Sequence, residues 1–222
     1  MMDRLDLTGS GRMYAYGEIL ALQERLVRSR LNGDTGDILL LLEHQHVLTK
    51  GTRTDPANIY FTDEQLASKG IEVFEVNRGG DVTYHGPGQL IGYPIVQLKD
   101  HEQGIRWFIR SLEDAIIDLL GSRFGIEGHA GSGKLTGVWV GERKIAAFGL
   151  AVVHGVTMHG FALNINTDLR YFDLINPCGL SKGVTSVLNE TGAPADVHEC
   201  SQILTSMIEK RQIGRASCRE RV

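Results

Sequence analysis

Residues 137–166 read GVWVGERKIAAFGLAVVHGVTMHGFALNIN, and this stretch decides the fold class. It divides into three runs with strand character, Gly137–Val140, Lys144–Val153 and Val156–Asn166, joined only by a Gly-Glu-Arg turn and a His-Gly turn. Connections this short join neighbouring antiparallel strands. The stretch therefore predicts an antiparallel arrangement inside a sheet.

Helix and strand patterns flank this stretch on both sides. Apolar residues recur at spacings of three and four through Gly104–Phe124, which predicts the clearest helix of the chain. Thr62 and Gln65 have the spacing of a capping box, which opens a short helix before Gly70. The other expected elements are helices over Tyr14–Leu31 and about Ala195–Glu209, and strands over Asp37–Glu43, Glu72–Val76 and Leu90–Leu98.

Within the last of these strands, Pro94 favours an edge position or a bulge, because proline cannot donate a ladder hydrogen bond. No β-α-β repeat occurs, so a doubly wound parallel sheet is not expected. We expect one mixed α/β (α+β) domain over residues 1–212, with a mixed, largely antiparallel sheet packed against helices.

Composition excludes several classes of protein. Of the 222 residues, 42% are hydrophobic and 23% are charged, which is typical of a globular domain and not of a disordered chain. No apolar run approaches the roughly 20 residues of a membrane-spanning helix, and the N-terminus lacks a signal or transit pattern. A formal net charge of −4 gives no basic field for nucleic acid. We expect a soluble cytoplasmic protein that binds neither nucleic acid nor membrane.

The last ten residues, IGRASCRERV (213–222), differ in character from the rest of the chain. They are rich in arginine and lack an apolar period, and they resemble the translation of a common sequencing-adapter DNA. We interpret them as a non-native tail that replaces the natural C-terminus; a solvated basic tail is the alternative. Without the tail, Lys+Arg fall from 23 to 20 and Asp+Glu from 27 to 26, for a net charge of −6.

The densest cluster of chemically useful residues is RGGDVTYHGPGQ, residues 78–89. Its glycines let the backbone approach a ligand closely, while an arginine, a threonine, a tyrosine and a histidine supply hydrogen-bonding groups. A glycine-rich hairpin with a structural arginine fits the same residues, and composition does not separate the two interpretations.

Two other motifs give weaker evidence of a functional site. Gly128 and Gly133-Lys134 have the spacing of a phosphate-binding loop, but Leu135 replaces the Ser/Thr that would hold Mg²⁺, and a strand pattern follows where a helix should begin. His44 and His46 lie on one side of an expected strand without a third ligand at a sensible spacing, so we expect no metal site.

The three cysteines are an odd number without C-x-x-C spacing, which fits neither a disulfide framework nor a zinc site. Cys200 lies among helix residues and is expected to pack as a small hydrophobic group, whereas Cys178 lies in the turn Asn-Pro-Cys-Gly. A thiol becomes a useful nucleophile when a nearby cation or base favours its thiolate. Candidates for that partner are Lys144, within an apolar strand, and His85 or His159.

Five motifs of the chain together resemble the signature of a known family. RGGDVTYHGPGQLIGYP, LTGVWVGERKIAAFG, MHGFALNIN, FDLINPCG and GVTSV together are similar, in the same order, to the signature of the lipoyl(octanoyl) transferases. The resemblance extends from about Gly36 to Thr191. It implies the fold of biotin and lipoate protein ligases, an acyl-thioester intermediate on Cys178, and Lys144 beside it. A departure is His46, where relatives more often have proline, and the suspected tail is another.

The resemblance also implies an acyl pocket. Its expected lining residues are Arg78, Gly79, Gly80, Asp81, Val82, Thr83, Tyr84, His85, Ala147, Phe148, Gly149, Gly160, Phe161 and Ala162.

The implied reaction moves an octanoyl group from octanoyl-acyl-carrier protein to the lysine of a lipoyl domain, as in 2-oxoacid dehydrogenase E2 subunits or glycine-cleavage H protein. This is the first step of endogenous lipoate synthesis. An amide is more stable than a thioester, so neither ATP nor another cofactor is expected. Lys144 acts either as a cation that stabilises the thiolate or as a neutral base, and Arg78, loop amides and His85 position the thioester and stabilise negative charge.

The acyl-carrier partner is acidic, so a local basic patch is expected from Lys50, Arg53, Arg143 and Lys182. Three other functions remain open on the residues. An ATP-dependent lipoate or biotin ligase of the same fold would not need Cys178. A Cys/His thioesterase would release free octanoate, and a non-catalytic module would only bind a lipoylated partner.

Overall fold

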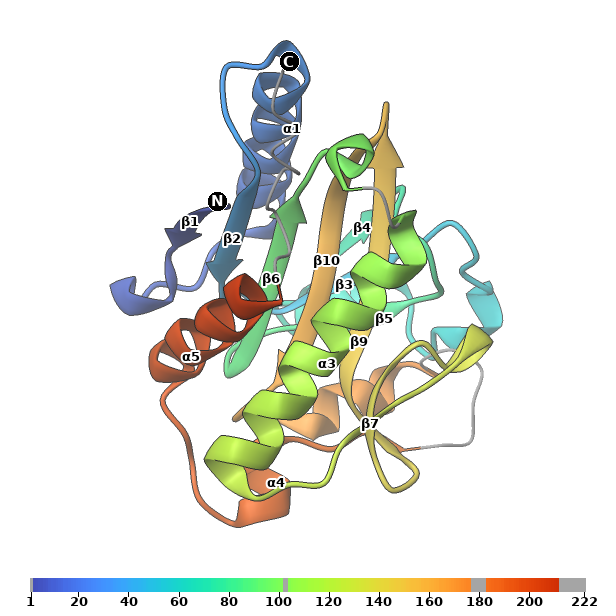
Figure 1. Ribbon diagram of the computed structural model, residues 1–222. Coiled ribbons are helices and arrows are strands. Elements are labelled where there is room, and N and C mark those ends of the chain that lie inside the picture. Colours follow the sequence, from blue (N-terminus) through green and yellow to red (C-terminus); the bar gives the residue numbers. More distant parts are fainter. Residues whose placement is uncertain (1, 102–103, 177–182, 212–222) are drawn as a thin grey trace, which may run out of the picture.

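The computed structural model describes residues 2–101, 104–176 and 183–211. Its main sheet has seven strands in the order β1-β2-β6-β10-β9-β8-β7. Within this sheet only β1 and β2 pair in parallel, and the other pairs are antiparallel (Figure 1). The mixed, largely antiparallel α/β fold expected from the sequence is therefore confirmed. The strands are β1 (Asp3–Asp6), β2 (Ile38–Leu42), β6 (Gln89–Ile95), β7 (His129–Ala130), β8 (Gly137–Val140), β9 (Arg143–Val153) and β10 (Val156–Asn164).

The stretch that decides the fold class forms β8, β9 and β10. Each pairs antiparallel with the next, as the short turns predict. A second sheet of three strands has the order β4-β3-β5, with β4 (Glu72–Glu75), β3 (Val47–Lys50) and β5 (Thr83–His85). The sequence predicts β4 but neither β3 nor β5, and β3 is the central strand that pairs with both of the others. The glycine-rich residues 78–81 connect β4 to β5.

Helices cover both faces of the main sheet (Figure 1). The helix α1 packs against β10 and β6 on one face, and α3 and α5 pack on the other face and against each other. Their bounds are α1 (Tyr16–Asn32), α2 (Asp63–Ser68), α3 (Gly104–Phe124), α4 (Val187–Thr191) and α5 (Val197–Lys210). The sequence predicts α3 with these bounds, and predicts α1 and α5 to within two residues at each end.

The strand β2 shows why the core has two layers. All five of its residues are buried. Leu39 and Leu41 belong to the cluster under α3 and α5, whereas Leu40 and Leu42 belong to the cluster under α1. Because both faces of β2 are buried, its sequence is a continuous hydrophobic run, Ile38–Leu42, instead of an alternating pattern.

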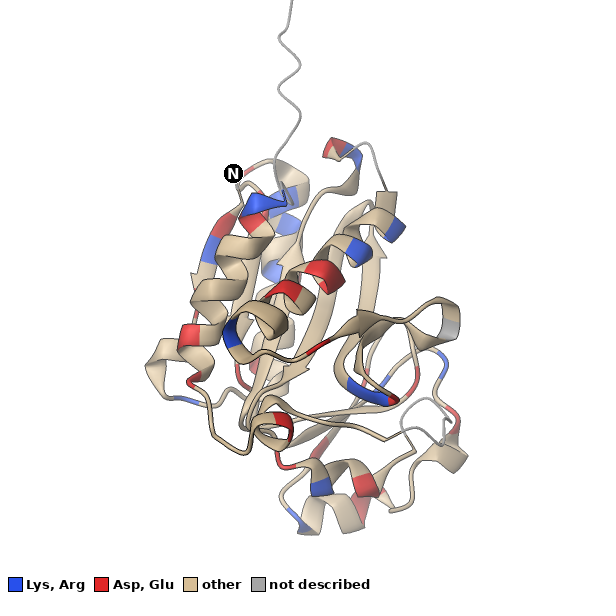
Figure 2. Ribbon diagram, turned by 60° about the horizontal axis from the view of Figure 1, so that its bottom comes forward, with Lys and Arg blue, Asp and Glu red and all other residues tan. Residues whose placement is uncertain are grey.

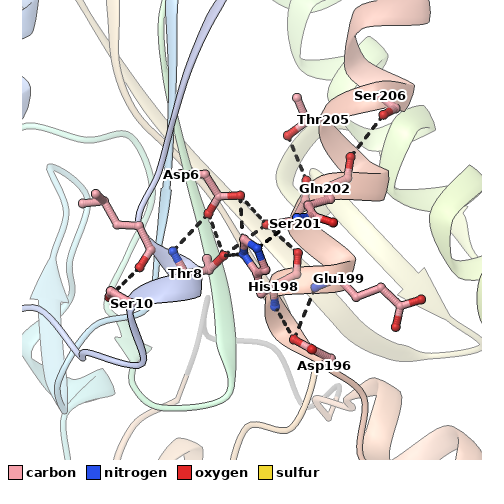
Figure 3. Close-up of polar contacts among 11 residues, drawn as sticks. Asp6, Thr8, Ser10, Asp196, His198, Glu199, Ser201, Gln202, Thr205 and Ser206 are labelled. Carbon is pink, nitrogen blue, oxygen red and sulfur yellow. Dashed lines mark hydrogen bonds and ion pairs between the residues drawn. The ribbon is translucent and has the colours of Figure 1, made fainter.

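Side-chain caps begin two of the helices, and the one at α2 is the capping box that the sequence predicts. At α2 the Thr62 side chain accepts from the Gln65 amide while the Gln65 side chain accepts from the Thr62 amide, a complete capping box. At α5 the Asp196 side chain caps the first turn. Figure 3 shows the polar contacts by which this end of α5 meets the first strand: Thr8 Oγ1 lies 2.8 Å from His198 Nδ1, and Ser201 Oγ donates to Asp6 over 2.7 Å.

Cys200, on α5, is 2% exposed, and burial raises the pKa of its thiol to about 11. The prediction that Cys200 packs as a small hydrophobic group is confirmed.

The edge position expected for Pro94 is wrong. It lies in β6, between β2 and β10, and pairs with Leu39. The continuous β6–β10 ladder ends at Gly92, and the Thr157 hydroxyl takes over by donating to the Pro94 carbonyl and accepting from the Val96 amide. A side chain thus supplies hydrogen bonds where proline cannot.

The central strands β2, β6 and β10 carry no Lys, Arg, Asp or Glu, and the charged residues lie on the helices, the loops and other strands (Figure 2). Within the described ranges, no helix is long and apolar enough to cross a membrane. The proposed tail, 213–222, lies outside the described residues, so its origin stays a prediction.

Candidate active site

A cavity of about 300 Å³ lies where β9 and β10 face β5 and the glycine-rich connection before it. Such a volume is at the lower end of the usual range for small-molecule sites, about 300–1,000 Å³. The N-terminal part of α3 contributes Ile105 and Ile109, and α1 contributes Tyr16. Much of the wall is apolar, and Lys144 is part of it.

The structure brings the predicted pocket residues together with one exception. The lining includes Arg78, Gly79, Gly80, Asp81, Val82, Thr83, His85, Ala147, Phe148, Gly149, Gly160, Phe161 and Ala162. Tyr84 lies apart, because side chains alternate along β5 and it follows Thr83. It packs against Tyr171 and Phe172, and its hydroxyl lies 2.7 Å from His46 Nδ1.

The glycine-rich connection lies directly on β9. The Gly79 amide donates to the Leu150 carbonyl over 2.9 Å. A Cβ on Gly149 would lie 2.9 Å from the Gly79 carbonyl oxygen and 3.0 Å from Arg78 Cδ. Glycine at position 149 therefore permits the close approach that closes the cavity on this side.

Arg78 is 6% exposed and holds the connection against β3. Its Nη2 donates to the Thr49 carbonyl over 2.6 Å and its Nε to Thr49 Oγ1 over 3.0 Å, while Nη1 donates to the Gly79 carbonyl. Both interpretations of the glycine-rich stretch, a ligand-binding loop and a hairpin with a structural arginine, therefore fit Arg78. It holds the connection in place and also lines the cavity.

Lys144 enters the cavity from β9, which lies between β10 and β8. Its Nζ lies 4.8 Å from the centroid of the Trp139 ring and 3.4 Å from the Thr136 carbonyl oxygen. Both are partners that suit an ammonium group. The Lys144 backbone also donates to Gly183 and accepts from Thr185, so the chain that follows the 177–182 segment is attached beside this lysine. Cys178 lies outside the described residues, and its pairing with Lys144 stays a prediction.

Histidines and tyrosines form a buried polar cluster at the wall of the cavity. His85 lines the cavity, and burial, with the charge of His44 next, lowers its pKa to about 3. Burial likewise lowers the pKa of His159 and of His44 to about 4. Burial raises the pKa of the Tyr16 phenol to about 12. All of these groups are therefore neutral near pH 7.

His159 has a φ of +57°, which is unusual for a residue other than glycine. Its amide donates to Gln23 Oε1 over 2.8 Å, and its Nε2 lies 2.8 Å from Asn77 Oδ1. These contacts hold the ring at the wall of the cavity in spite of the backbone conformation.

Sequence reasoning missed several lining residues. Gln89 and Asn164 line the cavity and lie within the family motifs, but nothing in the local sequence marks them as partners across two strands. Ile105 and Ile109 follow the apolar period of α3 and are not distinguishable from core residues in the sequence. Trp139 pairs with Lys144 in the β8–β9 register. Because the sequence predicts this hairpin, it could have indicated Trp139 as a neighbour of Lys144.

The weaker motifs have structural roles. His44 lies 3.0 Å from the Tyr14 carbonyl and 2.9 Å from the Tyr93 hydroxyl through its two ring nitrogens. Within the described part of the chain, no group of three or more His, Cys, Asp or Glu is placed to hold a metal. After Gly133 comes a 3₁₀ turn and then β8, so the geometry of a phosphate-binding loop is not formed there.

The four basic residues expected to form a patch have different surroundings. Lys50 lies 3.2 Å from Asp63, and Arg143 lies 3.0 Å from Glu190. Arg53 lines the cavity, and Lys182 lies outside the described residues. The patch stays a prediction.

Comparison with known proteins shows the family of the chain. The family model described as the lipoyl protein ligase A/B catalytic domain matches residues 15–209. An octanoyltransferase of Solibacter usitatus is 52% identical over 191 residues, covering 86% of this chain and 85% of the relative. One from Alkaliphilus metalliredigens is 44% identical, covering 89% and 90%. The chain belongs to the octanoyltransferase family. It is therefore an acyltransferase, as the resemblance of its motifs indicates.

Solved structures agree on the fold. A lipoate-protein ligase A solved with ATP has a TM-score of 0.74 at 17% identity, covering 96% of this chain and 86% of the other. The bipartite lipoate protein ligase of Thermoplasma acidophilum has a TM-score of 0.67 at 18% identity, covering 96% and 84%. A biotin protein ligase of Aquifex aeolicus gives 0.56 at 14% identity, covering 95% and 68%. The expected biotin/lipoate protein ligase fold is confirmed.

Proposed function

We propose that this octanoyltransferase family member moves an octanoyl group from octanoyl-acyl-carrier protein to the lysine of a lipoyl domain, in the cytoplasm, through a thioester on Cys178. Acceptors would be E2 subunits of 2-oxoacid dehydrogenases and glycine-cleavage H protein. The observation that supports this most is the cavity itself, because it combines an apolar wall for an acyl chain with a lysine beside the attachment of the Cys178 segment.

The proposed reaction has two acyl transfers. The Cys178 thiolate attacks the carbonyl of the donor thioester, a C–S bond forms, and the carrier thiol leaves and takes up a proton. The neutral amine of the acceptor lysine then attacks the new thioester. An amide forms, the Cys178 thiolate is released, and the amine loses a proton. The amide product is more stable than the thioester, so no ATP is consumed.

Lys144 is proposed to stabilise the thiolate as a cation. The Trp139 ring and the Thr136 carbonyl are partners for an ammonium group, and a positive charge close to a thiol favours the thiolate. The alternative role requires Lys144 as the neutral amine, which would take the proton that the attacking amine loses. Arg78 and the amides of the glycine-rich connection are proposed to position the thioester carbonyl.

The test is a transfer assay without ATP. Purified protein is mixed with octanoyl-acyl-carrier protein and a lipoyl domain, and the mass of the lipoyl domain is measured. The proposal predicts a gain of one octanoyl group on its lysine. Modification only with free octanoate and ATP would instead indicate a ligase, and release of free octanoate without amide product would indicate a thioesterase.

A further inference from the structure

A chain of hydrogen bonds runs from the cavity across three strands to the backbone beside Lys144. His85 Nδ1 lies 2.8 Å from Gln89 Oε1, and Gln89 Nε2 lies 2.8 Å from Asn164 Oδ1. Asn164 Nδ2 then donates to the Thr185 carbonyl over 3.0 Å, and the Thr185 amide donates to the Lys144 carbonyl. His85, Gln89 and Asn164 are all buried and all line the cavity.

Backbone carbonyls fix the direction of this chain. The Thr185 carbonyl can only accept, so the Asn164 amide must present its NH₂ there and its oxygen to Gln89. Gln89 must then present its NH₂, which also lies 3.3 Å from the Tyr84 carbonyl, another obligate acceptor. The Gln89 oxygen is left facing His85. Neutral imidazole has one N–H, and the facing oxygen requires it on Nδ1.

We propose that Gln89 and Asn164 are positioning residues that hold His85 in the Nδ1–H tautomer, so that its Nε2 accepts a hydrogen bond from an N–H group of the substrate. Among the described residues, Nε2 has no hydrogen-bond partner, while the ring lines the cavity. Burial keeps the ring neutral, because it lowers the pKa of His85 to about 3. An Nε2 lone pair cannot stabilise developing negative charge, so in this proposal His85 positions the substrate, and charge stabilisation falls to Arg78 and the loop amides.

The identity of the donor rests on the proposed function. Two N–H groups come near a reacting thioester: an amide N–H on the arm of the acyl donor, and the attacking amine of the acceptor lysine. Both need an acceptor once water is excluded from a buried site.

The tautomer can be measured without substrate, by long-range ¹H–¹⁵N correlation spectra of protein labelled on histidine. We expect the His85 proton on Nδ1 and an unprotonated Nε2 at neutral pH, with the signals assigned by their loss in His85→Phe. His44 is an internal reference, since its Nδ1 faces the Tyr14 carbonyl and must also carry the proton. A proton on Nε2 of His85 in the wild type would overturn the proposal.

Variants then test the positioning role. Gln89→Met should release the His85 tautomer and leave the His44 signals unchanged. Gln89→Glu should keep the proton on Nδ1, because a carboxylate still accepts from it. The matched control is Gln97→Met, a buried glutamine in the segment that follows β6 and outside the cavity lining, which should change neither histidine. An unchanged His85 signal in folded Gln89→Met would contradict the positioning role.

Steady-state kinetics of His85→Phe identifies the donor. Loss of one neutral hydrogen bond should raise one KM by about fivefold. A rise for octanoyl-acyl-carrier protein alone assigns the N–H to the donor arm, and a rise for the lipoyl domain alone assigns it to the attacking amine. An unchanged KM for both substrates would overturn the substrate contact. Failure of the proposed function has a different signature, namely no transfer by the wild type.

Discussion

Substitution of Ala147 by leucine should shorten the acyl chain that the protein accepts. Ala147 lies on β9, opposite Ala162 of β10, and both side chains line the cavity. Ala162 also packs in the cluster under α1, where a larger side chain would disturb the core. Ala147 is only half-buried and belongs to no core cluster, so its new side chain has the cavity to enter. Ala147→Leu adds three carbon atoms to the wall of a cavity of about 300 Å³.

The expected magnitude follows from displaced methylene groups. If the three added carbons exclude three methylenes of the octanoyl chain, transition-state binding loses about 0.8 kcal/mol for each, or about 2.4 kcal/mol in total. A change of 1.36 kcal/mol is tenfold in rate, so kcat/KM for an octanoyl donor should fall about 60-fold. A pentanoyl donor lacks the displaced methylenes and should be affected far less.

The assay compares kcat/KM for octanoyl and pentanoyl carrier thioesters in the wild type and the variant. The matched control is Ala151→Leu, on the same strand and the same face but outside the cavity lining, which should leave the ratio unchanged. Equal losses for both chain lengths, or an undiminished octanoyl rate in a folded Ala147→Leu protein, would refute the assignment of the acyl chain to this cavity.

Three other predictions concern catalysis, pH and packing. Lys144→Met should lower kcat/KM about 100-fold or more with an unchanged melting temperature, measured by transfer assay and circular dichroism; normal activity would exclude a catalytic lysine. Burial lowers the pKa of His44 from its ordinary value of 6.5 to about 4, so the stability that the neutral ring contributes is complete above pH 6.5 and falls as pH drops toward 4. Between pH 8 and pH 5, protonation of His44 should remove about 2 kcal/mol from the free energy of unfolding measured in urea. If His44→Phe loses as much stability over this pH range as the wild type, the loss does not come from His44. A Cβ on Gly160 would lie 2.1 Å from the Gly92 carbonyl oxygen, so Gly160→Ala should lower the free energy of unfolding by about 3 kcal/mol. The control is Gly36→Ala, where a Cβ meets open space and the free energy of unfolding should change by less than about 0.5 kcal/mol.

Elements whose signals are local could be predicted from the sequence. The helix α3 has a long apolar period, and the Thr62–Gln65 capping box marks the start of α2. Two strands of the small sheet were missed because β3 and β5 are only four and three residues long, too short for a clear alternating pattern. The place of Pro94 was wrong for a related reason: the Thr157 hydroxyl that compensates for the missing amide is 63 residues away, and its position depends on which strands pair.

The candidate site divides in the same way. The glycine-rich stretch marked the cavity, because its glycines and polar groups are contiguous in the chain. Tyr84 was included because the whole motif was transferred from the family, although alternation along a strand puts it on the other face of β5. The link from Gln89 to Asn164 spans 75 residues, so it could be found only after the pairing of β6 and β10 was known.

Intact-protein mass after mixing with octanoyl-acyl-carrier protein, without an acceptor, tests the central claim most directly. The account predicts one added octanoyl group on the wild type, removed by hydroxylamine and absent from Cys178→Ala. A folded wild type that stays unmodified, or a Cys178→Ala protein that gains the same group, would contradict a thioester intermediate on Cys178.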